Sequence, residues 1–290
     1  SVLVPQLLRE GHRVRVLDNF RFGQASLLGV CYDPNLSIIR GDVRDGETLK
    51  KALDGVDFIV HLAAIVGAPL CDRDPIASRT TNVDAVARLI ELREQGQKII
   101  YPCTNSGYGI GQEGIYCTEE SPLRPVSLYG RLKVEAEKAL MESGNCISLR
   151  LATVFGASPR MRWDLLVNDF VLRAVRDRYL VLFQADFKRN YVHILDVAGA
   201  FIHCLRHWDV VKDQAYNVGL SSANLSKREL CERIKEQVPD FYFVEAEVGE
   251  DRDKRNYVVS NEKFEATGWR PGFTLEEGIK ELVKACQMWG

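Results

Sequence analysis

Tyr129 and Lys133 are the two side chains in this sequence that are best suited to move a proton together. They are spaced as Tyr-x-x-x-Lys, and residues four apart lie on one face of a helix. An ammonium group beside a phenol favours the phenolate and so lowers the pKa of the phenol. Such a tyrosine can take a proton from a sugar or alcohol hydroxyl near neutral pH. Because about half a match to this spacing is expected by chance in a chain with 10 tyrosines, the context of the pair must support it.

Thr104 offers a hydroxyl group for the same chemistry. It lies in the run 101–109, which follows a predicted strand and should therefore lie on the ligand side of a sheet. A hydroxyl there can hydrogen-bond the reacting oxygen and, with Tyr129, hold it for proton and hydride transfer. The two neutral residues that follow, Asn105 and Ser106, are candidates for contacts with a substrate.

Short β-rich runs alternate with helical patterns in the first half of the chain. Strands are predicted at 14–17, 37–40, 56–62, 98–101 and 147–151, and helices at about 46–54, 77–95 and 127–142. Strands separated by helices indicate βαβ units with right-handed crossovers and a parallel sheet. We therefore predict an α/β fold, a Rossmann-type doubly wound sheet that binds its ligand at the carboxyl ends of the strands.

The second half is typical of a smaller α/β lobe. Helical patterns cover about 160–182, 196–201, 227–237 and 275–289, and strands are predicted at 180–183 and 190–193. We predict a nucleotide-binding domain at 1–155 and a substrate-binding lobe at 156–290, with 190–207 returning to the first domain.

The sequence opens on a helical pattern at 1–10, with no strand or glycine-rich loop before it. A nucleotide-binding sheet of this class normally has its first strand and phosphate-binding turn at that point. A parallel sheet without its central strand would leave unpaired backbone groups in the core. We therefore expect the natural chain to extend beyond Ser1.

Two acidic residues follow predicted strands at the expected ligand edge. Asp18 can accept hydrogen bonds from both ribose hydroxyls and would repel a 2′-phosphate, which favours NAD over NADP. Arg21 weakens this preference, and a turn or helix-capping aspartate is the alternative role. Asp42 can accept from the adenine amino group, with a loop aspartate that caps the next helix as its alternative.

The bulk properties exclude several classes of protein. The chain has 290 residues, 46% hydrophobic and 27% charged, as globular proteins do. Its net charge of −2 gives no field that would favour nucleic acid or an anionic membrane, and no apolar run approaches the roughly 18 residues needed to cross a bilayer. The eight cysteines include no Cys-x-x-Cys pair and no cluster with histidine, which predicts reduced thiols in a cytoplasmic protein and no metal site.

Further motifs follow one another in order along almost the whole chain. They are Gly41-Asp42-Val43, His61-Leu62-Ala63-Ala64, Thr81-Asn82-Val83, Tyr108-Gly109, Arg189-Asn190-Tyr191-Val192-His193, Tyr216-Asn217-Val218-Gly219 and Gly268-Trp269-Arg270-Pro271. With Asp18, Thr104, Tyr129 and Lys133, they give the chain a resemblance to the extended short-chain dehydrogenases/reductases, specifically the NAD-dependent sugar-nucleotide epimerase/dehydratase family. The sequence departs from that family in lacking the Gly-x-x-Gly-x-x-Gly turn, on which pyrophosphate binding depends.

The resemblance implies NAD as cofactor, a nucleotide sugar as substrate and a homodimer formed through the helices at 77–95 and 127–142. It implies that Tyr129 is the general base, that Lys133 holds the nicotinamide ribose and lowers the pKa of Tyr129, and that Thr104 orients the sugar hydroxyl. Hydride would pass from the sugar, typically from C4, to NAD.

The same resemblance implies contacts for two further sets of residues. Those at the cofactor are Asp18, Asn19, Asp42, Val43, Leu62, Ala63, Ala64, Asn82, Tyr129, Lys133, Thr153 and Val154. Those at the substrate are Asn105, Ser106, Arg160, Arg162, Asn168, Arg189 and Arg255, with Arg189 expected at the diphosphate. Solvated surface positions are the alternative for these arginines and for Asn168.

Asn105 and Ser106 narrow the reaction within this family. The family's 4,6-dehydratases carry an acid at these positions, because the departing hydroxyl needs a proton donor, and its C3/C5 epimerases place a cysteine where Ser106 stands. Oxidation at C4 remains, either released as a ketone or reversed on the other face by a 4-epimerase.

A closer similarity favours the first of these outcomes. The stretches 64–71, 104–111, 117–125, 151–170 and 219–225 are similar to GDP-heptose 4-dehydrogenases of bacterial capsule sugar pathways. They predict C4 oxidation of a GDP-sugar, with a nucleotide-sugar 4-epimerase as the alternative. A non-catalytic NAD-sensing protein is a remote alternative, since such proteins usually lack the catalytic tyrosine.

Overall fold

The computed structural model describes residues 1–23, 25–112, 114–246 and 255–289, and it divides into two compact units. The first unit consists of Ser1–Gly107, Pro125–Arg150 and Ala198–Tyr216. The second consists of Tyr108–Arg124, Leu151–Val197 and Asn217–Gly290. These boundaries differ from a single division at 155/156, because 108–124 groups with the second unit and 198–216 returns to the first. The functions assigned to the two parts stay predictions.

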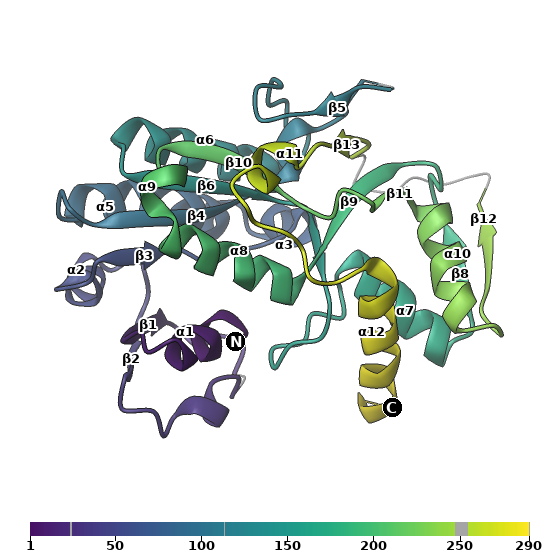
Figure 1. Ribbon diagram of the computed structural model, residues 1–290, viewed down its shortest axis with the longest axis horizontal. Coiled ribbons are helices and arrows are strands. Elements are labelled where there is room, and N and C mark those ends of the chain that lie inside the picture. Colours follow the sequence, from purple (N-terminus) through teal and green to yellow (C-terminus); the bar gives the residue numbers. More distant parts are fainter. Residues whose placement is uncertain (24, 113, 247–254, 290) are drawn as a thin grey trace. The chain divides into compact units, whose positions relative to one another are not determined.

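The first unit is a parallel α/β structure (Figure 1). Its strands are β1 (Val14–Asp18), β2 (Leu36–Arg40), β3 (Phe58–Val60), β4 (Lys98–Thr104), most of β6 (Cys146–Leu151) and the start of β10 (Gln214–Val218). Strands β1 and β2 form a parallel pair, and the other four form a sheet in the order β10-β6-β4-β3, in which β3 and β4 are parallel. The α/β Rossmann-type fold predicted from the sequence is confirmed.

Helices cover one face of this sheet, and every second side chain of β4 points toward them. In β4, Ile99, Tyr101 and Cys103 point to one side and join the core formed with α2 (Gly46–Leu53), α5 (Ala85–Leu92) and α6 (Leu128–Ser143). Each of the three side chains is 3% exposed or less. The smaller helices of this unit are α1 (Leu3–Arg9), α3 (Ala68–Arg73), α4 (Pro75–Arg79), α9 (Trp208–Val211) and most of α8 (Ile194–Arg206). Helix α6 therefore lies directly over the strand that ends at Thr104.

The predicted helix at 77–95 is wrong in one respect. It is divided into α4, a π-helical turn at Thr80–Asp84 and α5. The turn contains Asn82, whose side chain hydrogen-bonds the backbone of Ile65 instead of extending a regular helix face. A tertiary hydrogen bond of this kind leaves no periodic signal in the sequence.

The described residues of the second unit form three small sheets and a core of their own. Its strands are β5 (Tyr116–Cys117), β7 (Thr153–Phe155), β8 (Tyr179–Leu182), β9 (Lys188–His193), β11 (Asn224–Ser226), β12 (Tyr242–Glu245) and β13 (Val258–Val259). They pair as β11-β9-β7, β12-β8 and β13-β5. Helices α7 (Leu166–Arg176), α10 (Lys227–Gln237) and α12 (Leu275–Trp289) surround an apolar core with β8 and β9, and α11 (Glu262–Glu265) follows β13.

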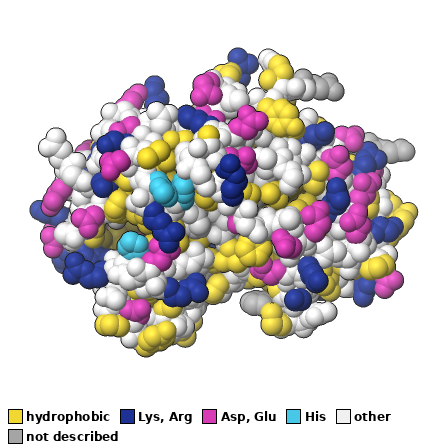
Figure 2. All heavy atoms as spheres, in the orientation of Figure 1, with side chains coloured by type: hydrophobic (Ala, Val, Ile, Leu, Met, Phe, Trp, Pro, Cys, Tyr) yellow, Lys and Arg dark blue, Asp and Glu magenta, His cyan; other side chains and the backbone are white. Residues whose placement is uncertain are grey.

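Helix α7 begins later than the predicted start at about 160. The residues before it form a loop instead, in which the carbonyl oxygen of Arg162 accepts a hydrogen bond from Asn168 Nδ2 at 3.0 Å. None of the described helices is long and apolar enough to span a bilayer. On the face drawn in Figure 2, acidic and basic side chains are interspersed, as the net charge of −2 leads one to expect.

Candidate active site

The carboxyl ends of β1 and β2 bring together three of the residues predicted to contact the cofactor. Asp18 and Asn19 are exposed, and each accepts a hydrogen bond from the backbone two residues on, at 2.7 Å from Phe20 N and 3.1 Å from Arg21 N. Beside them, Asp42 has a pKa of about 2, held down chiefly by its hydrogen bond with Arg44 and to a smaller extent by one with Asn19. The Asp42 carboxylate is therefore ionised at any physiological pH, in an ion pair with Arg44.

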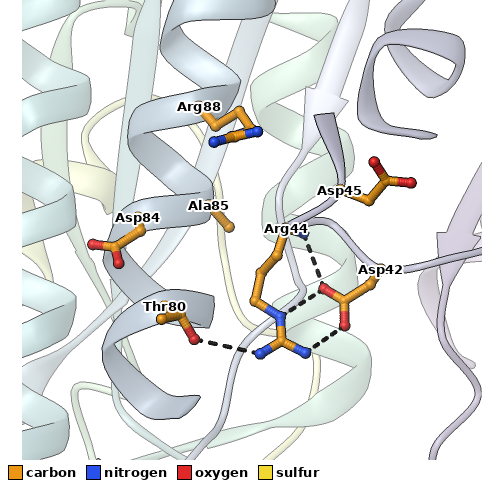
Figure 3. Close-up of a pocket in the computed structure, with 7 residues that line it drawn as sticks. All are labelled: Asp42, Arg44, Asp45, Thr80, Asp84, Ala85 and Arg88. Carbon is orange, nitrogen blue, oxygen red and sulfur yellow. Dashed lines mark hydrogen bonds and ion pairs between the residues drawn. The ribbon is translucent and has the colours of Figure 1, made fainter. Parts of the chain in front are cut away.

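Asp42 also borders a cavity of about 560 Å³ on the first unit (Figure 3). Its two carboxylate oxygens accept from the Arg44 side chain at 2.9 and 2.7 Å, and Arg44 donates to Thr80 Oγ1 at 3.4 Å. Asp45, Asp84 and Arg88 complete the charged lining. The contact of Asp42 with adenine stays a prediction. The adenine amino group would have to hydrogen-bond a carboxylate that already accepts from Arg44. Val43, the next residue, is buried.

The loop after β3 carries the small residues predicted to lie against the cofactor. Leu62 is 53% exposed, and Ala63 and Ala64 are half-buried. Asn82, which is 2% exposed, holds the end of this loop: its Oδ1 accepts from Ile65 N at 2.8 Å and its Nδ2 donates to Ile65 O at 2.9 Å. Both polar atoms of Asn82 are therefore committed to shaping the loop.

Thr104 ends β4 and forms a hydroxyl pair with Ser106. Its Oγ1 donates to Ser106 Oγ at 2.9 Å and accepts from Ser106 N at 3.1 Å. Between them, Asn105 is 1% exposed, and neither polar atom of its amide has a hydrogen-bond partner among the described residues. A buried amide without partners is costly, and a ligand is one way of satisfying it.

Gly130 lets the start of the helix that carries Tyr129 pack against the backbone of Ser106. Helix α6 begins with Ser127, whose Oγ accepts from Gly130 N at 3.1 Å. A Cβ added to Gly130 would lie only 3.2 Å from the carbonyl oxygen of Ser106, so the glycine allows the helix start to approach that backbone. Tyr129, half-buried, therefore starts its helix beside the Thr104–Ser106 segment.

Lys133, one turn further along α6, is 3% exposed. Its ammonium lies 3.8 Å from the centre of the Tyr101 ring, a cation–π contact. Burial lowers the pKa of Lys133 to about 8, against the opposing effect of the nearby groups Cys103, Glu137 and Cys71. His61 lies nearby, and burial together with the charge of Lys133 lowers the pKa of His61 to about 4, which keeps that imidazole neutral.

Glu137 and Arg150 form a buried ion pair that we did not predict from the sequence. They are 4% and 7% exposed, and the Arg150 Nη2 and Nε atoms donate to Glu137 Oε1 at 2.7 and 2.9 Å. The available signal was the continuation of the pattern to Tyr-x-x-x-Lys-x-x-x-Glu, which places all three side chains along one side of α6.

The second unit contains the remaining predicted residues. Thr153 and Val154 lie in β7, where they pair with β9. Arg189, in β9, is 3% exposed, and it and Arg255 both act on the phenol of Tyr191: their charges lower its pKa, although burial raises it above the usual value overall. A buried arginine is unusual, and this burial distinguishes Arg189 from a solvated surface residue.

Three predicted substrate residues lie in and after the loop that follows β7. Arg162 forms a bidentate pair with Asp164 at 2.7 and 2.6 Å, and Arg160 is half-buried. Asn168 is 1% exposed, accepting from Gly156 N at 3.0 Å and donating to the carbonyl oxygen of Arg162 at 3.0 Å. The helix-surface alternative for Asn168 is therefore wrong, and these backbone contacts explain its burial.

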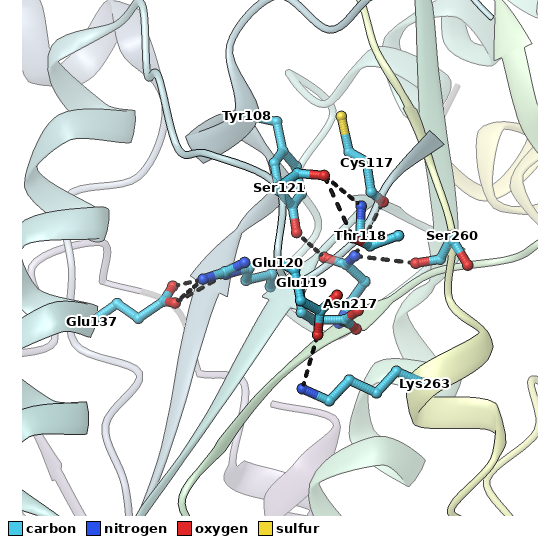
Figure 4. Close-up of polar contacts among 11 residues, drawn as sticks. Tyr108, Cys117, Thr118, Glu119, Glu120, Ser121, Glu137, Asn217, Ser260 and Lys263 are labelled. Carbon is cyan, nitrogen blue, oxygen red and sulfur yellow. Dashed lines mark hydrogen bonds and ion pairs between the residues drawn. The ribbon is translucent and has the colours of Figure 1, made fainter. Parts of the chain in front are cut away.

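A hydrogen-bond network around Asn217 stabilises the second unit (Figure 4). Tyr108 Oη donates to Asn217 Oδ1 at 2.7 Å, and Asn217 N donates to Glu119 Oε1 at 2.6 Å. Asn217 Nδ2 donates to the carbonyl oxygen of Ser260 at 3.1 Å. The motifs Tyr108-Gly109 and Tyr216-Asn217-Val218-Gly219 thus meet through side chains, which their spacing in the sequence did not show.

Comparison with known proteins places these features in a family. The sequence model of the NAD dependent epimerase/dehydratase family matches residues 1–219. Low-salt glycan biosynthesis protein Agl12 of Haloferax volcanii is 28% identical over 270 residues, covering 89% of this chain and 84% of that protein. UDP-glucose 4-epimerase of Lacticaseibacillus casei is 26% identical over 317 residues, covering 100% of this chain and 92% of that protein.

A solved structure agrees with the sequence comparisons. The crystal structure of Thermus thermophilus UDP-glucose 4-epimerase in complex with NAD has a TM-score of 0.84 at 26% identity, covering 98% of this chain and 94% of that one. The chain belongs to the NAD-dependent epimerase/dehydratase family and is an enzyme whose cofactor is NAD.

Proposed function

We propose that this enzyme is a nucleotide-sugar 4-epimerase. The observation that carries the proposal is the hydroxyl pair of Thr104 and Ser106 at the end of β4, against whose backbone the start of α6 is packed. Helix α6 carries Tyr129 and the buried Lys133. This set can hold a sugar hydroxyl and remove its proton, and Asn105 and Ser106 are neutral where a dehydratase carries an acid. The relatives support the same choice, since one of them is a UDP-glucose 4-epimerase.

The residues of the first unit suit NAD. Asp18 presents an exposed carboxylate at the end of β1, where ribose hydroxyls can reach it. The buried His61 Nε2 and the Asn105 amide have no hydrogen-bond partner among the described residues, and a cofactor or substrate would supply one. When NAD is bound, it supplies the hydride acceptor and donor.

The protein side chains carry out the proton chemistry in this proposal. Thr104 holds the sugar O4 by a hydrogen bond, and Tyr129 takes the O4 proton as the C4 hydrogen leaves as hydride. The Lys133 ammonium favours the phenolate form of Tyr129. Return of hydride to the opposite face and of the proton from Tyr129 to O4 completes the epimerisation.

We also propose that Arg189 and Arg255 of the second unit bind the nucleotide diphosphate. Two cations that act on the same buried phenol, Tyr191, provide a local positive charge suited to a dianion. Arg160, Arg162 and Asn168 are weaker candidates, because Arg162 already pairs with Asp164 and Asn168 with backbone. As in the family at large, we expect a homodimer through α5 and α6, which light scattering of the purified protein would measure.

The competing reaction is C4 oxidation with release of the ketone. The proposal of GDP-heptose as substrate rests only on local sequence similarity. Neither relative named above has GDP-heptose in its name: one is a UDP-glucose 4-epimerase and the other a glycan biosynthesis protein. One experiment separates the outcomes: the purified enzyme is incubated with UDP- and GDP-sugars, with products analysed by NMR and absorbance followed at the NADH band.

A 4-epimer without net NADH supports the proposal, whereas stoichiometric NADH with a keto sugar would establish the dehydrogenase. A 4-keto-6-deoxy sugar would show that the neutral residues do not prevent dehydration. Tyr129→Phe should abolish turnover whether the enzyme is an epimerase or a dehydrogenase.

A further inference from the structure

The Glu137–Arg150 pair lies one helical turn beyond Lys133, in a place where water does not reach it. Arg150, in β6, donates hydrogen bonds through Nη2 and Nε to the carboxylate of Glu137 in α6. Glu137 is labelled in Figure 4. Burying two charges costs several kcal/mol of desolvation, so such a pair contributes little to stability compared with apolar residues. Its place beside a third buried charge suggests a role other than stability.

The groups that interact with the Lys133 side chain come from several of the elements packed around it. On β4 these are Tyr101 and Cys103, on α3 Cys71, after β3 His61, and on α6 itself Glu137. The two thiols are neutral near pH 7, because burial raises their pKa values, and the His61 imidazole is neutral as well. Glu137 is therefore the one nearby side chain in this set that carries a full negative charge near neutral pH.

We propose that Glu137 and Arg150 together set the charge of Lys133: Glu137 keeps the ammonium protonated, and Arg150 holds the Glu137 carboxylate in place and limits its attraction for the ammonium. Both are positioning residues, since neither is placed at the reacting atoms. The proposal rests on the proposed function in one respect, namely that a charged Lys133 assists Tyr129.

The two halves of the pair should act on Lys133 in opposite directions. Glu137→Gln removes the attracting anion and leaves the Arg150 cation unbalanced, so Lys133 should lose its proton at lower pH. Arg150→Met removes the opposing cation and leaves the anion, so Lys133 should keep its proton to higher pH. For side chains one turn apart at an effective dielectric constant of about 20, shifts of about one to two pH units are expected.

The experiment is an NMR titration of the full chain labelled with 13C-lysine, with the Lys133 resonance assigned by its loss in Lys133→Arg. Glu137→Gln, Arg150→Met and the double variant are compared with Glu142→Gln. Glu142 is the matched control, because it lies on the same helix in an exposed pair with Lys138, 3.9 Å away. The control should leave the titration of Lys133 where it is.

Opposite shifts for the two single variants, with a smaller downward shift for the double variant, would support the proposal. A purely structural pair would instead lower the unfolding temperature of both single variants and leave the Lys133 titration unmoved, and that result would overturn it. If one single variant fails to fold, the other decides, because an unshifted Lys133 titration in that variant would refute the idea. The double variant leaves no unpaired buried charge, so it should fold, and it should move the Lys133 titration down by less than Glu137→Gln does.

This titration requires no turnover, so it distinguishes the two proposals. If Lys133 shifts as predicted while Tyr129→Phe keeps full activity, the proposed function fails and the role of the ion pair stands. If Tyr129→Phe is inactive and Lys133 does not respond to Glu137→Gln, the ion pair has no such role and the proposed function stands. In an active enzyme, the alkaline limb of the pH–rate profile should move in the same direction as the Lys133 titration.

Discussion

Replacing Lys133 by methionine should make the enzyme more stable while removing its activity. Burial lowers the pKa of this ammonium from 10.5 to about 8. Since each pH unit of such a difference is worth about 1.4 kcal/mol, keeping Lys133 charged in the folded protein at pH 7 costs about 3 kcal/mol. The variant also loses the cation–π contact with the Tyr101 ring, which reduces its gain in stability by about 1 kcal/mol. The free energy of unfolding of Lys133→Met should therefore exceed that of the wild type by about 2 kcal/mol at pH 7.

The sign of the pH dependence makes this prediction sharp. Below pH 8, Lys133 is charged in both the folded and the unfolded wild-type chain, and the full penalty is present. As the pH rises from 8 to 10.5, the folded protein loses the proton while the unfolded chain keeps it, so the wild type becomes more stable relative to the variant. The advantage of Lys133→Met should shrink steadily over that window.

Urea unfolding at several pH values from 7 to 10.5 measures the stability difference between Lys133→Met and wild type and its change with pH. The matched control is Lys138→Met on the same helix, where the side chain is 77% exposed and no comparable gain is expected. A Lys133→Met variant less stable than wild type at pH 7, or a stability difference that does not change with pH, would refute the reasoning about the buried ammonium.

Three further predictions concern neighbouring positions. Tyr129→Phe should reduce kcat by about 10²- to 10⁴-fold, the usual contribution of a positioned base, with NAD affinity by calorimetry unchanged. Asp18→Ala should weaken NAD binding about tenfold and narrow its preference over NADP, because the exposed carboxylate that repels a 2′-phosphate is lost; an unaltered NAD:NADP ratio of dissociation constants would contradict the assignment. Gly130→Ala should lower kcat more than tenfold and the melting temperature as well, since its Cβ would crowd the Ser106 carbonyl at 3.2 Å. Its control is Gly199→Ala in a helix, where nothing lies within 4 Å and a gain of about 0.5–1 kcal/mol in stability is expected.

The parts of the fold that the sequence predicted are those with a local signal. Strand β4 contains the β-rich run 98–101 and α6 corresponds to the helix-favouring run 127–142, and both elements appear close to their predicted bounds. Tyr129 and Lys133 are spaced by one turn, so their shared helix followed directly from the sequence. The family and the cofactor were likewise recognisable, because ordered motifs extend along most of the chain.

The parts that the sequence missed depend on contacts between distant segments. Arg150 meets Glu137 because β6 lies beside β4, the strand against which α6 packs. The helical spacing of Lys133 and Glu137 indicated one half of the pair, but no local pattern indicated its partner in β6. The π-helical turn arises from the hydrogen bonds between Asn82 and Ile65, 17 residues away. Asn168 is a polar residue of the kind that usually lies on the exposed face of a helix, yet its side chain is buried by its hydrogen bonds with Gly156 and Arg162.

The amide of Asn82 has a consequence for the loop that we predict to lie against the cofactor. By pairing with both the N–H and the C=O of Ile65, it imitates the neighbouring strand that this loop does not have. The loop at 61–65 therefore loses its conformational freedom when the chain folds, and little ordering remains to be done when a ligand arrives. The Ile65 amide should accordingly exchange with deuterium slowly, as if it belonged to a sheet, before any NAD is added.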